Sequence, residues 1–214
     1  MAFWNAPLDV VNHAEDGCRS ALEMVAAMAP LNERLKQEAK EEGRKHLDLK
    51  VGLGLNSGEA VVGNMGTAQR MDYSVLGDTV NTAARLEGQS KTYGVDIVLG
   101  PNTYEAVKHF ATLRLDNIQV KGKTVGLLVY ALLGDEELAK DLEFIAVKEL
   151  VDKMLNTYTS QKWDDARTLV DELRSKGARF KLDVLCDLYE GRISAYEAEP
   201  PGADWDGIFI ATTK

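Results

Sequence analysis

The stretch that most restricts the fold of this chain is Gln69–Glu87, with the sequence QRMDYSVLGDTVNTAARLE. Gly77 indicates a turn, and Asp78 is a favourable N-cap for a helix that follows it. Asn81 lies in the first turn of that helix and Arg85 follows at i+4, so both side chains project from the same face. The stretch therefore predicts a tight turn that leads directly into a helix with two polar side chains near its N-terminus.

The N-terminal end of this helix is a candidate anion site. Free N–H groups and the helix dipole attract anions there, and the Asn81 amide and the Arg85 guanidinium would hold phosphate oxygens on the adjoining face. Val80, Ala83 and Ala84 are then expected to pack on the opposite side. The alternative is an ordinary capped surface helix with a solvated arginine. The residues alone favour that alternative, because capped helices are common.

The sequence around this helix resembles a known family. The run DYSVLGDTVNTAARLE and the preceding VGLGLNSGEAVVGNMG resemble the catalytic domain of class III nucleotide cyclases. The similarity is greatest to bacterial adenylate cyclases that an upstream sensor tethers to a membrane. The opening MAFWNAPLDV and the closing DWDGIFIATTK resemble the same group, so the resemblance covers essentially the whole chain. It implies that Asn81 and Arg85 are catalytic residues that stabilise the transition state.

The same resemblance implies substrate-binding roles for Ser74, Asp78 and Lys123. Ser74 matches the position whose hydroxyl or carboxylate contacts the base. A hydroxyl there is common in adenylate cyclases, whereas guanylate cyclases usually carry Cys. Lys123 matches a phosphate-binding lysine on a hairpin. Without the family, Lys121 and Lys123 around a glycine are better interpreted as a solvated hairpin tip.

The implied reaction converts ATP to 3′,5′-cyclic AMP and pyrophosphate in cyclic-nucleotide signalling. The ribose 3′ oxygen attacks the α-phosphorus, and two divalent ions, Mg²⁺ or Mn²⁺, activate it and neutralise the triphosphate. Asn81 and Arg85 would stabilise the charge that develops. Active sites of the family form between two catalytic domains, so the implied partner is a second cyclase domain in a homodimer or heterodimer.

The chain departs from the family pattern at its start. The two metal-binding aspartates of the family, and a lysine that helps to contact adenine, precede the position that matches Met1. Asp9, Glu15 and Asp16 match nothing in that motif, so no metal ligand is assigned. We therefore expect an N-terminally truncated adenylate cyclase that is inactive alone. The alternatives are a catalytically inactive nucleotide-binding or regulatory partner of a complete cyclase, and a helical interaction module on a degenerate domain.

Composition and charge exclude several other classes. A chain of 214 residues with 45% hydrophobic content can form one sizeable core and an appendage. The net charge of −9 argues against an extended nucleic-acid interface and against a basic membrane-surface face. No apolar run is long enough to span a bilayer. Cys18 and Cys186 form no spacing motif, which indicates free thiols in a reducing compartment. We expect a cytoplasmic location, like that of the cyclase domain in membrane-tethered relatives.

Hydrophobic patterning predicts mixed elements over the first part of the chain. We expect a helix over residues 10–42 that Pro30 kinks or divides, and a hairpin through Asn56-Ser57-Gly58 that is followed by a flexible loop over residues 63–72. The string GLGLNSG is only superficially similar to a dinucleotide-binding loop, because it leads into a strand and not into a helix. The expected strands cover residues 1–4, 47–55, 59–63, 95–99, 113–120 and 125–133.

After Gly134 the pattern becomes helical. Amphipathic helices are expected over residues 138–158, 162–176 and 180–198, and residues 205–212 are expected to dock back on the body. We therefore predict an α+β fold. Residues 1–134 would form a ferredoxin-like nucleotide cyclase domain, with its N-terminal strand and helices missing and with helices on one face of the sheet. Residues 135–214 would form an α-helical C-terminal extension.

Overall fold

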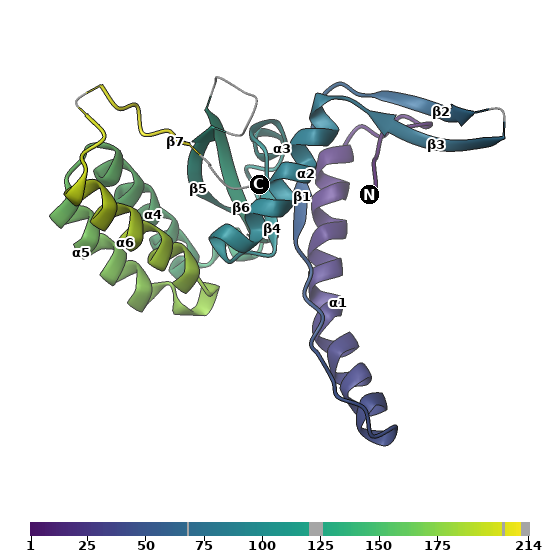
Figure 1. The fold of residues 1–214 in the computed structure, drawn as a ribbon, viewed down its shortest axis with the longest axis horizontal. Coiled ribbons are helices and arrows are strands. Elements are labelled where there is room, and N and C mark those ends of the chain that lie inside the picture. Colours follow the sequence, from purple (N-terminus) through teal and green to yellow (C-terminus); the bar gives the residue numbers. More distant parts are fainter. Residues whose placement is uncertain (68, 120–125, 203, 211–214) are drawn as a thin grey trace.

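The computed structural model describes residues 1–67, 69–119, 126–202 and 204–210. Figure 1 shows the long helix α1 and the hairpin β2–β3 extending away from the body, and α4, α5 and α6 gathered at the other end. The elements follow the chain in the order α1 (His13–Glu41), β1 (Leu53–Leu55), β2 (Val61–Thr67), β3 (Arg70–Leu76), α2 (Asp78–Tyr93), β4 (Ile97–Leu99), α3 (Pro101–Ala106), β5 (Ala111–Gln119), β6 (Leu127–Gly134), η1 (Leu138–Lys140), α4 (Leu142–Thr159), α5 (Trp163–Lys176), η2 (Ala178–Phe180), α6 (Asp183–Ala198) and β7 (Phe209–Ile210).

A five-stranded mixed sheet forms the centre of the body. Its strand order is β1-β4-β6-β5-β7. β1 runs parallel to β4, and β7 runs parallel to β5, whereas β6 is antiparallel to both β4 and β5. The expected α+β fold with a helical C-terminal part is therefore confirmed. Near the C-terminal end, β7 adds to the edge of the sheet beside β5.

Both faces of the sheet are covered by helices. Ile97 and Leu99 of β4 pack in a cluster with Cys18 and Ala21 of α1, whereas Val98 packs in the cluster that contains α2 and α4–α6. This alternation follows from the strand geometry, in which successive side chains point to opposite faces. The expectation of helices on one face only is wrong, because both faces of the buried central strands are apolar and each needs a cover.

The helices α4–α6 share a core with the sheet. One hydrophobic cluster contains Leu113 and Leu115 of β5 together with Val151 of α4, Val170 of α5 and Tyr189 of α6. The buried Tyr189 hydroxyl also donates a hydrogen bond to the carbonyl oxygen of Leu115 at 2.7 Å. The division of the chain after residue 134 stays a prediction, and the segments on its two sides are joined by this core.

The expected hairpin through Asn56-Ser57-Gly58 is wrong. β1 pairs with β4, and the hairpin consists of β2 and β3, so residues that were expected to be a loop form its strands. The reason lies in the turn itself. The Asn56 side-chain amide donates to the carbonyl oxygen of Thr79 at 3.2 Å, and the carbonyl oxygen of Ser57 accepts from Asn102 at 3.1 Å. These bonds hold the turn against α2 and α3 instead of closing a strand pair.

Two expectations at the N-terminal end also differ from the structure. Residues 1–4 form no strand, and Met1 is 86% exposed. Within the part of the chain that is described, no neighbouring strand lies beside them, so their backbone has no ladder to join. α1 continues through Pro30 without a break, and this proline is on the exposed side of the helix.

Across the described residues, no helix combines the length and hydrophobicity needed to cross a membrane.

Candidate functional site

The turn between β3 and α2 positions the helix that carries the candidate residues. Gly77 has φ 152° and is the N-cap, and α2 begins at Asp78. A positive φ is adopted easily only by glycine, which explains this residue at this turn. The prediction of Asp78 as the N-cap is therefore wrong by one position. Asp78 instead lies in the first turn, where a carboxylate interacts favourably with the helix dipole.

One side of α2 is buried, but it is not the expected side. Ala84 is exposed, and Val80 and Ala83 are only partly buried. The prediction followed the apolar alanines, but three of the four buried positions of α2 carry hydroxyls. The buried side chains of α2 are those of Thr82, Leu86, Ser90 and Tyr93.

Glycines of the VGLGLNSG motif let α2 lie close to β1 and to the turn after it. A Cβ atom at Gly52 would lie 2.2 Å from Oγ of Ser90, and one at Gly58 would lie 2.6 Å from Oγ1 of Thr79. These separations are too short for non-bonded atoms, so a side chain at either glycine would displace the helix or its side chains. The motif therefore serves helix packing, in agreement with the argument against a dinucleotide-binding loop.

Four of the candidate residues lie in one continuous strand–turn–helix unit. Ser74 is half-buried on β3 and faces Gly63 across the hairpin. Asp78, Asn81 and Arg85 follow on one side of α2, with Asn81 exposed and Arg85 half-buried. Within the described residues, neither the Asn81 amide nor the Arg85 guanidinium has a hydrogen-bond or ion-pair partner. Of the two residues, only Asn81 is exposed, and the half-buried Arg85 lies one turn further along α2.

Other candidates are not placed by the structure. Lys121 and Lys123 lie outside the described residues. Arg70, at the start of β3, forms an ion pair with Asp72 at 3.5 Å on the exposed hairpin. In the described part of the chain, no group of three or more His, Cys, Asp or Glu residues could hold a metal ion. The described residues therefore offer no ligand set that fits a resident Mg²⁺ or Mn²⁺ ion.

The sequence analysis missed a buried charged cluster at the far end of α2. Tyr93, Asp116 and Arg192 come from α2, β5 and α6, and all three are nearly inaccessible to solvent. Burial and the neighbouring Asp116 carboxylate raise the pKa of Tyr93 well above its usual value, so its hydroxyl remains a donor. A sequence signal for this cluster did exist: Arg192 lies within the apolar pattern of residues 180–198, where a buried charge needs a partner.

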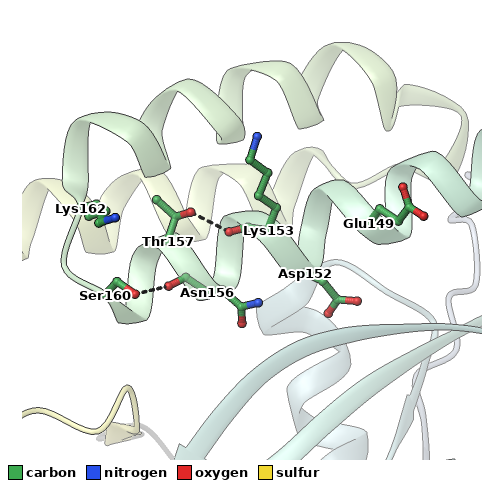
Figure 2. Close-up of a pocket in the computed structure, with 7 residues that line it drawn as sticks. All are labelled: Glu149, Asp152, Lys153, Asn156, Thr157, Ser160 and Lys162. Carbon is green, nitrogen blue, oxygen red and sulfur yellow. Dashed lines mark hydrogen bonds between the residues drawn. The ribbon is translucent and has the colours of Figure 1, made fainter.

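A surface hollow of about 500 Å³ lies elsewhere, along α4. Its side chains point in different directions and do not converge (Figure 2). The hydroxyls of Thr157 and Ser160 donate to backbone carbonyls at 2.8 and 2.7 Å, and Arg114 binds the Asn156 side chain at 2.8 Å. Because several of its polar groups are already paired and its side chains do not converge, this hollow is a weaker candidate than α2. Its lining residues are Glu149, Asp152, Lys153, Asn156, Thr157, Ser160 and Lys162.

Comparison with known proteins identifies the family of the chain. The family model described as the adenylate and guanylate cyclase catalytic domain matches residues 1–134. Adenylate cyclase 1 of Rhizobium meliloti is 34% identical over 135 residues, which are 63% of this chain and 19% of that protein. The adenylate cyclase of Anabaena cylindrica is 31% identical over 118 residues, which are 52% of this chain and 22% of that protein. The chain thus spans about a fifth of the length of these two relatives.

Solved structures of cyclases resemble part of the chain. The adenylyl cyclase CyaB from P. aeruginosa is 25% identical with a TM-score of 0.49, and the alignment covers 61% of this chain and 64% of that one. The guanylyl cyclase Cya2 is 30% identical with a TM-score of 0.49, and the alignment covers 62% of this chain and 64% of that one. The match to the family model covers more than half of the chain. The chain therefore belongs to the family of adenylate and guanylate cyclase catalytic domains.

Proposed function

We propose that this chain contributes the transition-state-stabilising half of an adenylate cyclase site, formed with a second cyclase domain. The observation that carries the proposal is the pair Asn81 and Arg85 on one side of α2, where the exposed amide and the half-buried guanidinium have no partner among the described residues. Two relatives that are named adenylate cyclases support ATP as the substrate. The hydroxyl of Ser74 supports the same choice, through the family position that it matches.

The chemistry required of these residues is electrostatic. Negative charge develops on the phosphate oxygens while the ribose 3′ oxygen attacks the α-phosphorus. A guanidinium can donate two parallel hydrogen bonds to such oxygens, and an amide can donate another. Asn81 and Arg85 would supply these bonds from a helix whose N-terminal dipole also favours negative charge. In this proposal Ser74 contacts the base, Asp78 lies at the nucleotide, and Lys123 binds the terminal phosphates.

The second domain has a defined task in this proposal. The described residues offer no cluster of ligands for a divalent ion. The carboxylates that hold Mg²⁺ or Mn²⁺ are therefore assigned to the partner. Such an ion neutralises the triphosphate. The isolated chain is accordingly expected to make no cyclic AMP from ATP with either metal.

A mixing experiment tests the proposal. A complete cyclase of this family is inactivated at its own Asn/Arg pair, its metal-binding aspartates are left intact, and this chain is added. Weak cyclic AMP synthesis is expected. Arg85→Ala or Asn81→Ala in this chain should lower it about 100- to 1,000-fold, the usual cost of one charge-stabilising donor. Arg34→Ala is the matched control, because Arg34 is an exposed α1 residue that forms an ion pair with Glu38 on the same helix.

The possible outcomes separate the candidate roles. Rescue that depends on Arg85 supports the composite site. A heterodimer that forms without any rescue would overturn it and would favour a regulatory partner. Cyclic AMP synthesis by the isolated chain, lost on Asn81→Ala, would show that the chain holds its own metal ions and would also contradict the proposal.

A further inference from the structure

A buried carboxylate joins three elements at the end of α2 that is remote from Asn81. Arg192 of α6 donates from Nη1 to Oδ2 of Asp116 on β5 at 2.7 Å. The Tyr93 hydroxyl, on the last residue of α2, donates to the same oxygen at 2.8 Å. Asp116 is 4% exposed and Arg192 is 6% exposed. Charges so deeply buried are costly unless they are paired, so each of the two depends on the other.

The surroundings show that this pair is more than a packing detail. The Arg192 guanidinium lies 3.5 Å from the ring centroid of Phe209 on β7, so the C-terminal strand covers it. Its Nε is buried and has no partner among the described residues. An incompletely satisfied buried pair is a poor source of stability, because apolar residues of similar volume often do as well or better. The arrangement instead fixes the relative positions of α6, β5, β7 and α2.

A second contact between α6 and α2 lies one residue further along the chain. Gly94 is the C-cap of α2, with φ 68°. A Cβ atom at Gly94 would lie only 2.4 Å from Cβ of Val184 on α6. The start of α6 therefore packs directly against the end of α2. Together with the Tyr93 hydrogen bond, this contact holds the end of the helix at two successive residues.

We infer that α6 acts as a positioning element for the candidate catalytic helix through the bonds from Arg192 and Tyr93 to Asp116. A helix is stiff over this length, and Arg85 lies about 12 Å along the axis from Tyr93. A displacement of α6 would therefore be transmitted to Asn81 and Arg85. Arg192 and Tyr93 are positioning residues in this scheme and do not contact the nucleotide. The inference rests on the proposed function of α2, and it assigns to the C-terminal helices a role in the cyclase site.

Amide hydrogen exchange on the whole chain tests the inference without a partner or a nucleotide. Tyr93→Phe keeps the ring and removes only the bond to Asp116. The double variant Asp116→Leu/Arg192→Met removes both charges, so that neither is left buried alone. In both variants, exchange of the amides in the last two turns of α2 should accelerate about tenfold, the effect of one lost hydrogen bond to a charged group. Exchange within α5 should not change.

Arg174→Met is the matched control. It breaks the ion pairs of Arg174 with Asp187 and Glu190 between α5 and α6, but it touches neither α2 nor Asp116. Its α2 exchange should equal that of the wild type. Unchanged α2 exchange in both test variants would overturn the inference. So would acceleration spread equally over all helices, because that result would show a general loss of stability.

The mixing assay adds a second readout. If α2 is displaced, Tyr93→Phe should lower kcat severalfold and leave KM for ATP within about twofold, because the lost interactions act in the transition state. Equal losses in kcat and in the folded fraction would indicate a merely structural role and would contradict positioning. If the wild-type chain gives no rescue, the proposed function fails, while hydrogen exchange still decides whether α6 controls α2.

Discussion

A Cβ atom at Gly54 of β1 would lie 2.2 Å from the carbonyl oxygen of Ala83 on α2. The same atom would lie 2.2 Å from the amide nitrogen of Glu87. The backbone of the strand therefore touches the backbone of the helix on both sides of Arg85, two residues before it and two after it. The absence of a side chain at Gly54 sets the height of Arg85 above the sheet.

The first prediction concerns this contact. In Gly54→Ala, the new methyl group meets main-chain atoms that cannot rotate away, so α2 must move. We expect the free energy of unfolding, measured in urea, to fall by about 1–3 kcal/mol, the usual cost of overpacking. Gly88→Ala is the control within the same helix, because a Cβ there meets no atom within 4 Å. It should raise stability by up to about 1 kcal/mol. A Gly54→Ala chain as stable as the wild type would contradict the packing described here.

Local patterns were sufficient to predict the helices. α1, α2 and α4–α6 follow the expected ranges within a few residues, because the apolar period of a helix is contained in the helix itself. The strands depend on partners elsewhere in the chain. The hydrogen bonds from Asn56 to Thr79 and from Asn102 to Ser57 hold the turn after β1 against α2 and α3, and neither bond can be inferred from the turn sequence.

Some residues of the candidate site could be predicted from the sequence, and others depend on contacts between distant parts of the chain. Resemblance to the family selected Ser74, Asp78, Asn81 and Arg85, and the structure places these four in one unit of consecutive elements. Their roles stay predictions. The bond between Asp116 and Arg192 could not have been predicted, because its two residues are 76 positions apart and meet only through the packing of α6 on the sheet.

The second prediction concerns the N-cap of α4. Oδ2 of Asp141 accepts from Arg179 at 2.9 Å, and Oδ1 accepts from the amides of Phe144 at 3.1 Å and Glu143 at 2.9 Å. The Arg179 bond, followed by these amide bonds, holds the pKa of Asp141 below its usual value. Because the folded-state pKa is lowered, the ionised carboxylate stabilises the fold above its unfolded pKa. That contribution is lost as the pH falls through the folded pKa.

Asp141→Asn should therefore lower the denaturation midpoint at pH 7, and the difference from the wild type should shrink as the pH falls below about 4. Thermal melts of both proteins at several pH values measure this difference in midpoint. Asp164→Asn removes the same charge from the first turn of α5, without an Arg179 contact, and should have a smaller effect. A difference between Asp141→Asn and the wild type that does not change with pH would contradict the role of the charge.

The third prediction concerns the projecting hairpin. Val61 and Leu76 form a cross-strand pair on one face of β2–β3, and they are 68% and 59% exposed. Adjacent exposed apolar side chains favour association. We expect the chain to self-associate in sedimentation velocity, and Val61→Lys to shift it toward the monomer. Thr67→Lys places the same charge on the same face at the far end of β2 and should have little effect. Equal sedimentation of the wild type and Val61→Lys would count against this surface.

The last prediction uses the two thiols as probes of unfolding. Cys18 and Cys186 are free and fully buried. Burial raises the pKa of Cys18 to about 12 and that of Cys186 to about 11, so the thiolate is scarce at pH 8. A thiol reagent should therefore react with neither cysteine in the folded chain. Cys18 belongs to α1 and lies in the cluster between this helix and the sheet, whereas Cys186 lies in the cluster that the sheet shares with α4–α6.

Single-thiol variants, Cys18→Ala and Cys186→Ala, each leave one reporter for labelling across a urea series. The division into a cyclase domain over residues 1–134 and an extension over residues 135–214 leaves open whether the two unfold separately. Because α4–α6 complete the core of the sheet, removing them would expose its apolar face. We therefore expect both thiols to become reactive at the same urea concentration, after correction for the stability of each variant. Two well-separated midpoints would show that the helices α4–α6 unfold as an independent unit.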